Sequence, residues 1–158
     1  MNRIEINAEE VPLPAWTPAL VLYIERVLEA LHKTNWDLSV LLCNDTRIRS
    51  LNNRYRGRDE ATDVLSFSLG ETLHEAEGDR YLPGDIVVSL DSLGENARYF
   101  GVKEHEELRR LVIHGILHLD GMDHATNDAG EAMLQLQEKL LNDLDDGALS
   151  SGFGEGAT

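Results

Sequence analysis

Residues 108–124 read LRRLVIHGILHLDGMDH, and the interpretation of the whole chain starts from this stretch. Its apolar residues recur at helical spacing, which predicts a long helix over about 103–119 that ends before Gly121. His114 and His118 are four residues apart, so they lie one above the other on the same face of that helix. Two imidazoles placed in this way can reach one metal ion.

A third imidazole follows the predicted helix. Gly121 lets the chain turn back and brings His124 to a place where it can complete a ligand set with His114 and His118. Three protein ligands leave one position of a tetrahedral ion open, which is typical of catalytic sites and not of structural ones. We therefore expect a catalytic metal site. Asp123 is a candidate to orient one of the imidazoles.

The same spacing, His-x-x-x-His-x-x-Gly-x-x-His, occurs in the metzincin metalloproteases, where a glutamate after the first histidine is the general base. Here that position is Gly115, so the catalytic carboxylate of peptide hydrolysis is absent. A metallopeptidase built on the same histidines stays open as an alternative, but it lacks its central residue.

A second feature is a run of arginines within residues 45–58, where five arginines and one acid give a local charge of +4. They are Arg47, Arg49, Arg54, Arg56 and Arg58. Arginine suits planar, bidentate contact with phosphate. Such a run alone is typical of a solvated helix face. Beside a metal site it predicts a cradle for a phosphodiester, which Arg109 and Arg110 extend as weaker candidates.

Composition limits the remaining possibilities. The 158 residues are about one domain's worth, and 29 acidic against 14 basic residues give a net charge of −15. This charge argues against a protein that coats nucleic acid or an anionic membrane. Cys43 is the single cysteine, which excludes an internal disulfide and favours a cytoplasmic location. No stretch approaches the roughly 18 apolar residues of a membrane helix, and the first ten residues do not resemble a signal peptide.

Hydrophobic patterning predicts four strands and five helices in mixed order, hence a single α/β or α+β domain over residues 1–146. The strands are expected over 3–7, 38–43, 64–69 and 84–89, and the helices over 17–33, 45–56, 91–100, 103–119 and 128–144. We interpret residues 71–80 as a mobile polar loop and residues 147–158 as a disordered tail. His105, like His32 and His74, has no ligand-like partner in the sequence and is expected at the surface.

Several motifs together resemble the YbeY family of metal-dependent endoribonucleases. They are Leu51-Asn52, Tyr55-Arg56-Gly57, the segment TDVLSF at residues 62–67, Gly84-Asp85-Ile86 and the histidine motif at residues 114–124. The resemblance covers about residues 1–145. It implies an α+β fold, with a small mixed four-stranded sheet, about five helices and a core similar to that of the zincin metalloproteases.

The resemblance also implies site residues. His114, His118 and His124 match the metal ligands of the family, with one Zn²⁺ per chain. Arg56 matches its catalytic-site arginine, so Arg56 and His114 are the expected catalytic residues. Arg54 and Arg58 flank Arg56 and are expected to bind RNA with it.

The implied activity is cleavage of single-stranded RNA in the maturation of the 16S rRNA 3′ end, in rRNA processing and in ribosome quality control. The implied partners are rRNA and the small ribosomal subunit, together with a ribosomal protein or a ribosome-associated GTPase. A ribosome-assembly factor with a structural metal is a further alternative.

Overall fold

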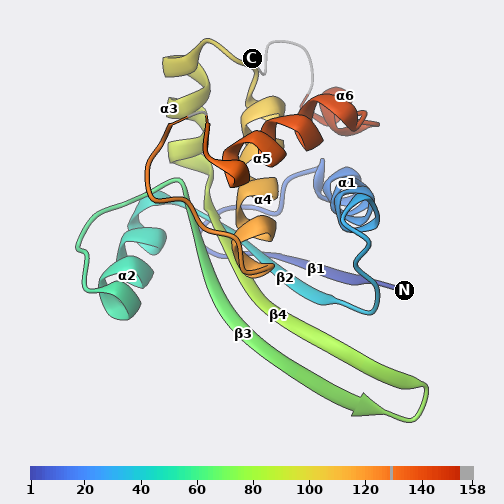
Figure 1. The fold of residues 1–158 in the computed structure, drawn as a ribbon. Helices are drawn as coiled ribbons and strands as arrows, with labels where there is room; N and C mark the ends of the chain where they lie inside the picture. The colour runs from blue at the N-terminus through green and yellow to red at the C-terminus, as the bar shows by residue number, and fades with distance from the viewer. Residues whose placement is uncertain (129, 154–158) are drawn as a thin grey trace.

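The structure is a computed structural model that describes residues 1–128 and 130–153. It confirms a single α+β domain, in which helices pack on a mixed four-stranded sheet (Figure 1). The strands are β1 (Arg3–Ala8), β2 (Asp37–Cys43), β3 (Val64–Glu75) and β4 (Gly78–Ser89). The described helices are α1 (Thr17–Ala30), α2 (Asp45–Arg56), α3 (Leu90–Phe100), α4 (Glu104–Leu119), α5 (Ala132–Asp143) and α6 (Leu149–Gly152).

The sheet has the strand order β1-β2-β4-β3. β1 and β4 run parallel to β2, and β3 runs antiparallel to β4 as an edge strand. Every second residue of β2 faces the main core, where Leu38, Val40 and Leu42 are buried. The helices α1, α4 and α5 cover this face with a continuous apolar cluster, which contributes most of the hydrophobic stabilisation.

The central helix α4 lies very close to the sheet because it has a glycine at the contact. A Cβ atom at Gly115 would lie 2.9 Å from Cγ2 of Ile86 on β4. Such a distance is below normal van der Waals contact, so a larger residue would push the helix away from the sheet. Gly115 therefore fixes the depth at which α4 presents its histidines.

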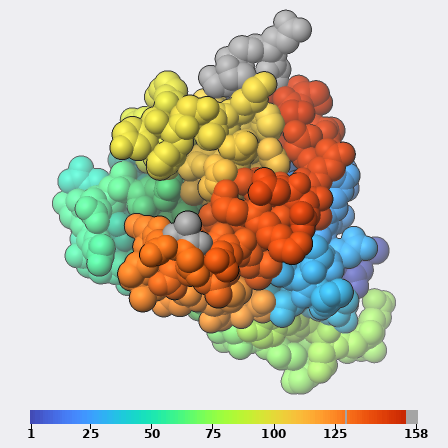
Figure 2. All heavy atoms as spheres, turned by 45° about the horizontal axis from the view of Figure 1, so that its top comes forward, coloured from blue at the N-terminus to red at the C-terminus, as the bar shows by residue number. Residues whose placement is uncertain are grey.

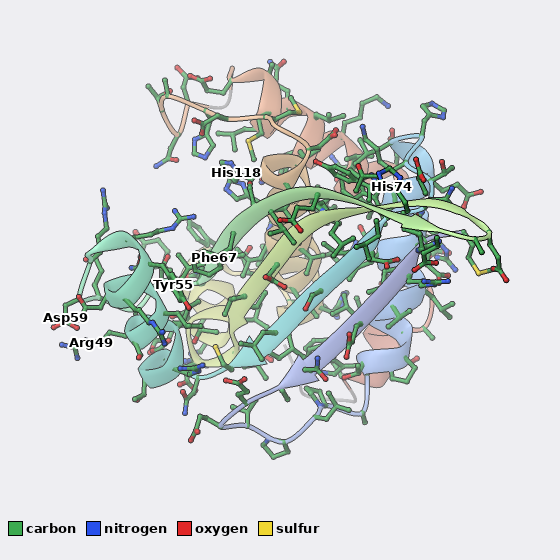
Figure 3. All side chains as sticks on the ribbon, turned by 90° about the horizontal axis from the view of Figure 1, so that it is seen from below. Arg49, Tyr55, Asp59, Phe67, His74 and His118 are labelled. Carbon is green, nitrogen blue, oxygen red and sulfur yellow. The ribbon has the colours of Figure 1, made fainter. Side chains whose placement is uncertain are left out.

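The opposite face of the sheet carries α2 at one end and is otherwise free of helices among the described residues, as Figure 3 shows. A small second core under α2 contains Cys43, Ile48, Leu65 and Val87, which confirms Cys43 as a buried strand residue. The helix begins where the side chain of Asn44 accepts a hydrogen bond from a backbone N–H of the first turn. It ends at a left-handed glycine, as its sequence predicts.

The prediction of a mobile loop over residues 71–80 is wrong. This segment forms the outer half of a long hairpin in which β3 and β4 stay paired to their ends, with a register shift between Ser68 and Glu71. Its side chains are mostly polar, with Leu73 the one large apolar residue, so the segment shows no apolar alternation. Backbone pairing supplies the order instead. Arg80 anchors the hairpin, since its Nε donates to Asp37 at 2.7 Å and Nη2 donates to the carbonyl of Met1 at 2.8 Å.

The prediction of a disordered tail is wrong for residues 147–153, and residues 154–158 lie outside the described part of the chain. Leu149 on α6 is fully buried, and the ring of Phe153 stacks on Trp16 with centroids 5.0 Å apart. Figure 2 shows this red segment against the blue α1. The expected surface position of His105 is also wrong, because its side chain is only 12% exposed and its ring centroid lies 6.0 Å from that of Phe153. Two apolar residues among glycines and serines are enough to dock a short segment.

The last long helix, α5, begins at Ala132, four residues later than predicted, and α6 brings the described helices to six. Within the described residues, no helix has the length and apolar character needed to span a membrane.

Candidate metal centre and its cleft

The predicted histidine trio comes together. His114 and His118 project from one face of α4, with their Nε2 atoms 3.1 Å apart. Gly121 adopts a positive φ of 90° directly after the helix, which lets the chain return toward the same face. This turn delivers His124, and the three residues offer ligand atoms that all lie within 4.8 Å of one another. That separation suits three imidazoles around one ion.

Hydrogen bonds select the ring nitrogen that faces the centre. Nδ1 of His114 lies 2.6 Å from Oε1 of Gln137, and Nδ1 of His124 lies 2.9 Å from the carbonyl oxygen of Thr126. Both partners can only accept, so each Nδ1 carries a proton and donates it. The Nε2 lone pairs of His114 and His124 are then left for a metal, as in most metal-bound histidines.

The electrostatics of the trio also favour metal binding. Burial lowers the pKa of His114 and of His118, which keeps both imidazoles neutral at pH 7. The neighbouring histidines lower these pKa values further, because two adjacent imidazolium ions repel each other. Neutral nitrogen donors without a cysteine fit Zn²⁺ or a similar divalent ion.

Asp123 has a different partner from the one predicted. Its carboxylate accepts a hydrogen bond of 2.8 Å from the backbone N–H of His124, and it lies 4.0 Å from Nδ1 of His118. The longer distance exceeds a hydrogen bond, so Asp123 stabilises the turn and orients no imidazole directly.

The residue that does orient a ligand was not visible in the sequence motif. Gln137 on α5 is 7% exposed and accepts from His114, while its Nε2 donates to Glu138 at 3.1 Å. Arg110 in turn donates to Glu138 at 3.0 Å and to the buried Glu107 at 3.0 Å. A polar network thus fixes His114 from behind. The available signal was a glutamine on the buried face of an apolar helix.

This network also corrects the expectation for Arg109 and Arg110. Arg110 is bound to three carboxylates behind the histidines, and Arg109 is buried with its guanidinium 5.8 Å from the ring of Tyr23. Neither residue lines the cleft described below, because both point into the helical layer.

Arg56 and the metal-binding face of α4 share one cleft of about 390 Å³ between β3 and α4. The lining residues are Arg56, Thr62, Asp63, Val64, Leu65, Ser66, Ser68, His114 and His118. Arg56 is held by a 2.6 Å hydrogen bond from its Nη2 to the carbonyl oxygen of Ser66. Within the described part of the chain no carboxylate lies within 4.0 Å of its guanidinium. Its remaining N–H groups are therefore available to an anion.

The other arginines of the run differ from Arg56. Arg49 forms a bidentate pair with Asp59 at 2.8 and 3.1 Å. Arg47 donates to Glu9 at 2.8 Å. These two charges are neutralised locally. Arg54 lies over the ring of its neighbour Tyr55, and Arg58 lies 3.9 Å from Glu60. Neither Arg54 nor Arg58 lines the cleft, so their expected role in RNA binding stays a prediction.

Asp63 forms the wall of the cleft where β3 begins. One carboxylate oxygen accepts from the backbone N–H of Val64 at 2.8 Å, a local bond common where a strand begins. The other accepts from Asn96 of α3 at 2.8 Å. This second contact, which the sequence did not reveal, ties α3 to the start of the edge strand.

A family model described as Endoribonuclease YbeY matches residues 4–145. A protein named Endoribonuclease YbeY from Treponema denticola is 46% identical over 142 residues, which cover 89% of this chain and 92% of that protein. One of the same name from Treponema pallidum is 44% identical, covering 89% of each. The solution structure of TM1509 from Thermotoga maritima superimposes with a TM-score of 0.60 at 31% identity, covering 96% of this chain and 90% of that one.

Proposed function

The chain belongs to the YbeY endoribonuclease family, and from this premise we propose that it cleaves single-stranded RNA with the help of a metal ion held by its three histidines. The observation that supports this most strongly is the placement of Arg56 in the same cleft as His114 and His118. A guanidinium and a metal site facing one cavity suit a phosphodiester, which carries its negative charge on non-bridging oxygens.

The residues of the cleft have two roles, which are binding of the metal ion and stabilisation of the negative charge on the phosphate. His114, His118 and His124 would hold the ion through Nε2, and Gln137 keeps the proton of His114 on the other ring nitrogen. When bound there, a divalent metal supplies Lewis acidity toward a phosphoryl oxygen and lowers the pKa of a coordinated water. Arg56 donates its free N–H groups to the phosphate and neutralises the charge that develops in the transition state.

A matched pair of arginine variants tests this assignment. We expect Arg56→Ala to retain the metal but to lose about 10²- to 10³-fold in the rate of RNA cleavage, as for removal of one preorganised donor. Arg49→Ala on the same helix is the control, because Arg49 lies outside the cleft and pairs with Asp59. Cleavage by Arg56→Ala at the parent rate would exclude a role for this arginine.

The finer assignment follows the same reasoning. We propose Zn²⁺ as the ion, one per chain, and Arg54 and Arg58 as further contacts to the RNA backbone. As substrate we propose the 3′ end of 16S rRNA, in rRNA processing and ribosome quality control in the cytoplasm. A ribosomal protein or a ribosome-associated GTPase would deliver the enzyme to the small subunit. Elemental analysis and mapping of 3′ ends on precursor rRNA, with and without chelator, test these points.

The peptidase alternative loses support from the position of Gly115. A Cβ atom there would lie 2.9 Å from Cγ2 of Ile86, so a carboxylate-bearing side chain does not fit without displacing α4. A parallel assay of casein and RNA hydrolysis separates the two activities. A factor whose metal is only structural would process rRNA equally well with Arg56→Ala, whereas we expect the variant to fail.

A further inference from the structure

A second cavity, a surface groove, lies beside α2 on the face of the sheet opposite α4. It has a volume of about 650 Å³, and its floor includes the side chains of Leu41 and Val87. Tyr55 from α2 and Phe67 from β3 form one wall, with ring centroids 5.4 Å apart at an angle of 62°. Tyr55 is 59% exposed, which is unusual for a large aromatic ring that packs on another. Figure 3 looks onto this face and shows the two rings between α2 and the sheet.

This groove adjoins the metal cleft across β3. Ser68 lines both cavities, and β3 is the wall that separates them. The guanidinium of Arg56 spans that wall, since it donates to Ser66 on the cleft side and lies 5.6 Å from the ring centroid of Phe67. When a phosphate of an RNA strand contacts Arg56 in the cleft, the adjacent nucleotide therefore lies next to the aromatic groove.

The distribution of charge favours a base in the groove over a phosphate. The cations Arg54 and Arg56 lie against Tyr55 and Phe67, at the side nearest the cleft. The sheet side of the groove carries the exposed carboxylate of Asp85, the cross-strand neighbour of Phe67, and the polar side chains of Asn7 and Ser39. Glu9 also lines the groove, and its carboxylate accepts a hydrogen bond from Arg47 at 2.8 Å. A carboxylate repels phosphate oxygens but accepts hydrogen bonds from the exocyclic amino groups of bases. Exposed aromatic rings beside arginines are the usual platform on which unpaired bases stack.

We propose that the groove between Tyr55 and Phe67 is a subsite for an unpaired RNA base, next to the nucleotide whose phosphate lies at Arg56 and the metal. The inference rests on the proposed function and adds to it a reason for single-strand preference. A base can enter the groove only when it is free to leave its stack, which a duplex does not allow. The groove would bind the ring face of any base, and it would prefer bases that present an amino group to Asp85.

Binding measurements on metal-free protein test the subsite apart from catalysis. The probe is a fluorescein-labelled single-stranded oligoadenylate of about eight nucleotides at fixed salt. We expect Tyr55→Ala to raise the Kd about 5- to 140-fold, the range for loss of one stacked base. Tyr55→Trp should restore binding, because it restores a stacking surface. Tyr99→Ala is the control, since Tyr99 is 84% exposed on α3 and lies outside both cavities.

Kinetics with the metal-loaded protein then separate this inference from the proposed function. We expect Tyr55→Ala to raise KM for the oligonucleotide while kcat stays near that of the parent. An unchanged Kd in Tyr55→Ala, or equal binding of a fully paired duplex, would overturn the subsite even if the parent cleaves RNA. A change only in the oligomeric state, measured by sedimentation, would assign the groove to a second copy of the chain and would equally overturn it. Failure of the loaded parent to cleave any RNA would instead reject the proposed function.

Discussion

The orientation of His114 by Gln137 leads to a quantitative prediction. Gln137→Leu keeps the size of this buried side chain but removes the acceptor that lies 2.6 Å from Nδ1 of His114. The imidazole then loses the bond that fixes its tautomer and its rotation. Loss of such an outer partner lowers metal affinity about 10- to 100-fold in other histidine sites, equal to about 1.4–2.7 kcal/mol. Gln137→Glu preserves the acceptor but loses the amide that donates to Glu138, so it should keep more of the affinity than Gln137→Leu and less than the parent.

Competition with a fluorescent zinc chelator at pH 7.5 measures this affinity directly. Gln135→Leu is the matched control, because Gln135 is exposed on the same helix and two residues away. Thermal unfolding of the metal-free variants separates local orientation from general damage. A zinc affinity of Gln137→Leu within twofold of the control would refute the reasoning. The same conclusion would follow if Gln137→Glu lost affinity as strongly as the leucine variant.

At a free zinc concentration 100-fold above the Kd, zinc binding should add about 2.7 kcal/mol to the free energy of unfolding and raise Tm by roughly 5–11 °C. Calorimetry should show no such rise in Tm for His118→Gln. It should show the full rise for His74→Gln, because the His74 ring is exposed on the hairpin. Because the pKa values of His114 and His118 are lowered in the folded state, the unfolded chain binds protons first. The metal-free protein should therefore lose stability as pH falls below about 6.5 toward the lowered pKa values of the folded state. Urea unfolding checks this slope, which should be shallower in His118→Gln. Leu149→Ala should lower the free energy of unfolding by about 2–5 kcal/mol, measured with urea, because Leu149 is fully buried on α6. A decrease as small as that in Ser150→Ala would show that α6 does not dock on the domain.

The elements that sequence patterning predicted well are those whose own residues carry the signal. The helix that bears His114 and His118 is apolar at helical spacing and is followed by a glycine turn, so both its extent and its histidine face follow from local rules. Arg56 also follows from the sequence, because its motif places it at the end of a capped helix. The cleft that joins it to the histidines depends on how α2 and β3 pack, which no local pattern records.

The failures have a common physical cause. Residues 71–80 are mostly polar and show no regular apolar alternation, yet backbone pairing and the contact of the buried Arg80 with Asp37 hold them in a hairpin. Leu149 and Phe153 are isolated apolar residues, and only the partner surface of Trp16 makes them ordered. Gln137 is distant in sequence from the histidine it orients. In each case the stabilising partner lies on another element, so the information is absent from the segment itself.

The central claim is that three imidazoles bind one metal ion and leave a coordination position open beside Arg56. A crystal of the zinc-loaded protein, with anomalous data collected on both sides of the zinc edge, tests it most directly. We predict a single strong peak about 2.0–2.1 Å from Nε2 of His114, His118 and His124, with a solvent or phosphate oxygen as fourth ligand on the side of the cleft. No peak between the three rings, or a peak whose fourth ligand is a protein side chain, would contradict a catalytic metal site.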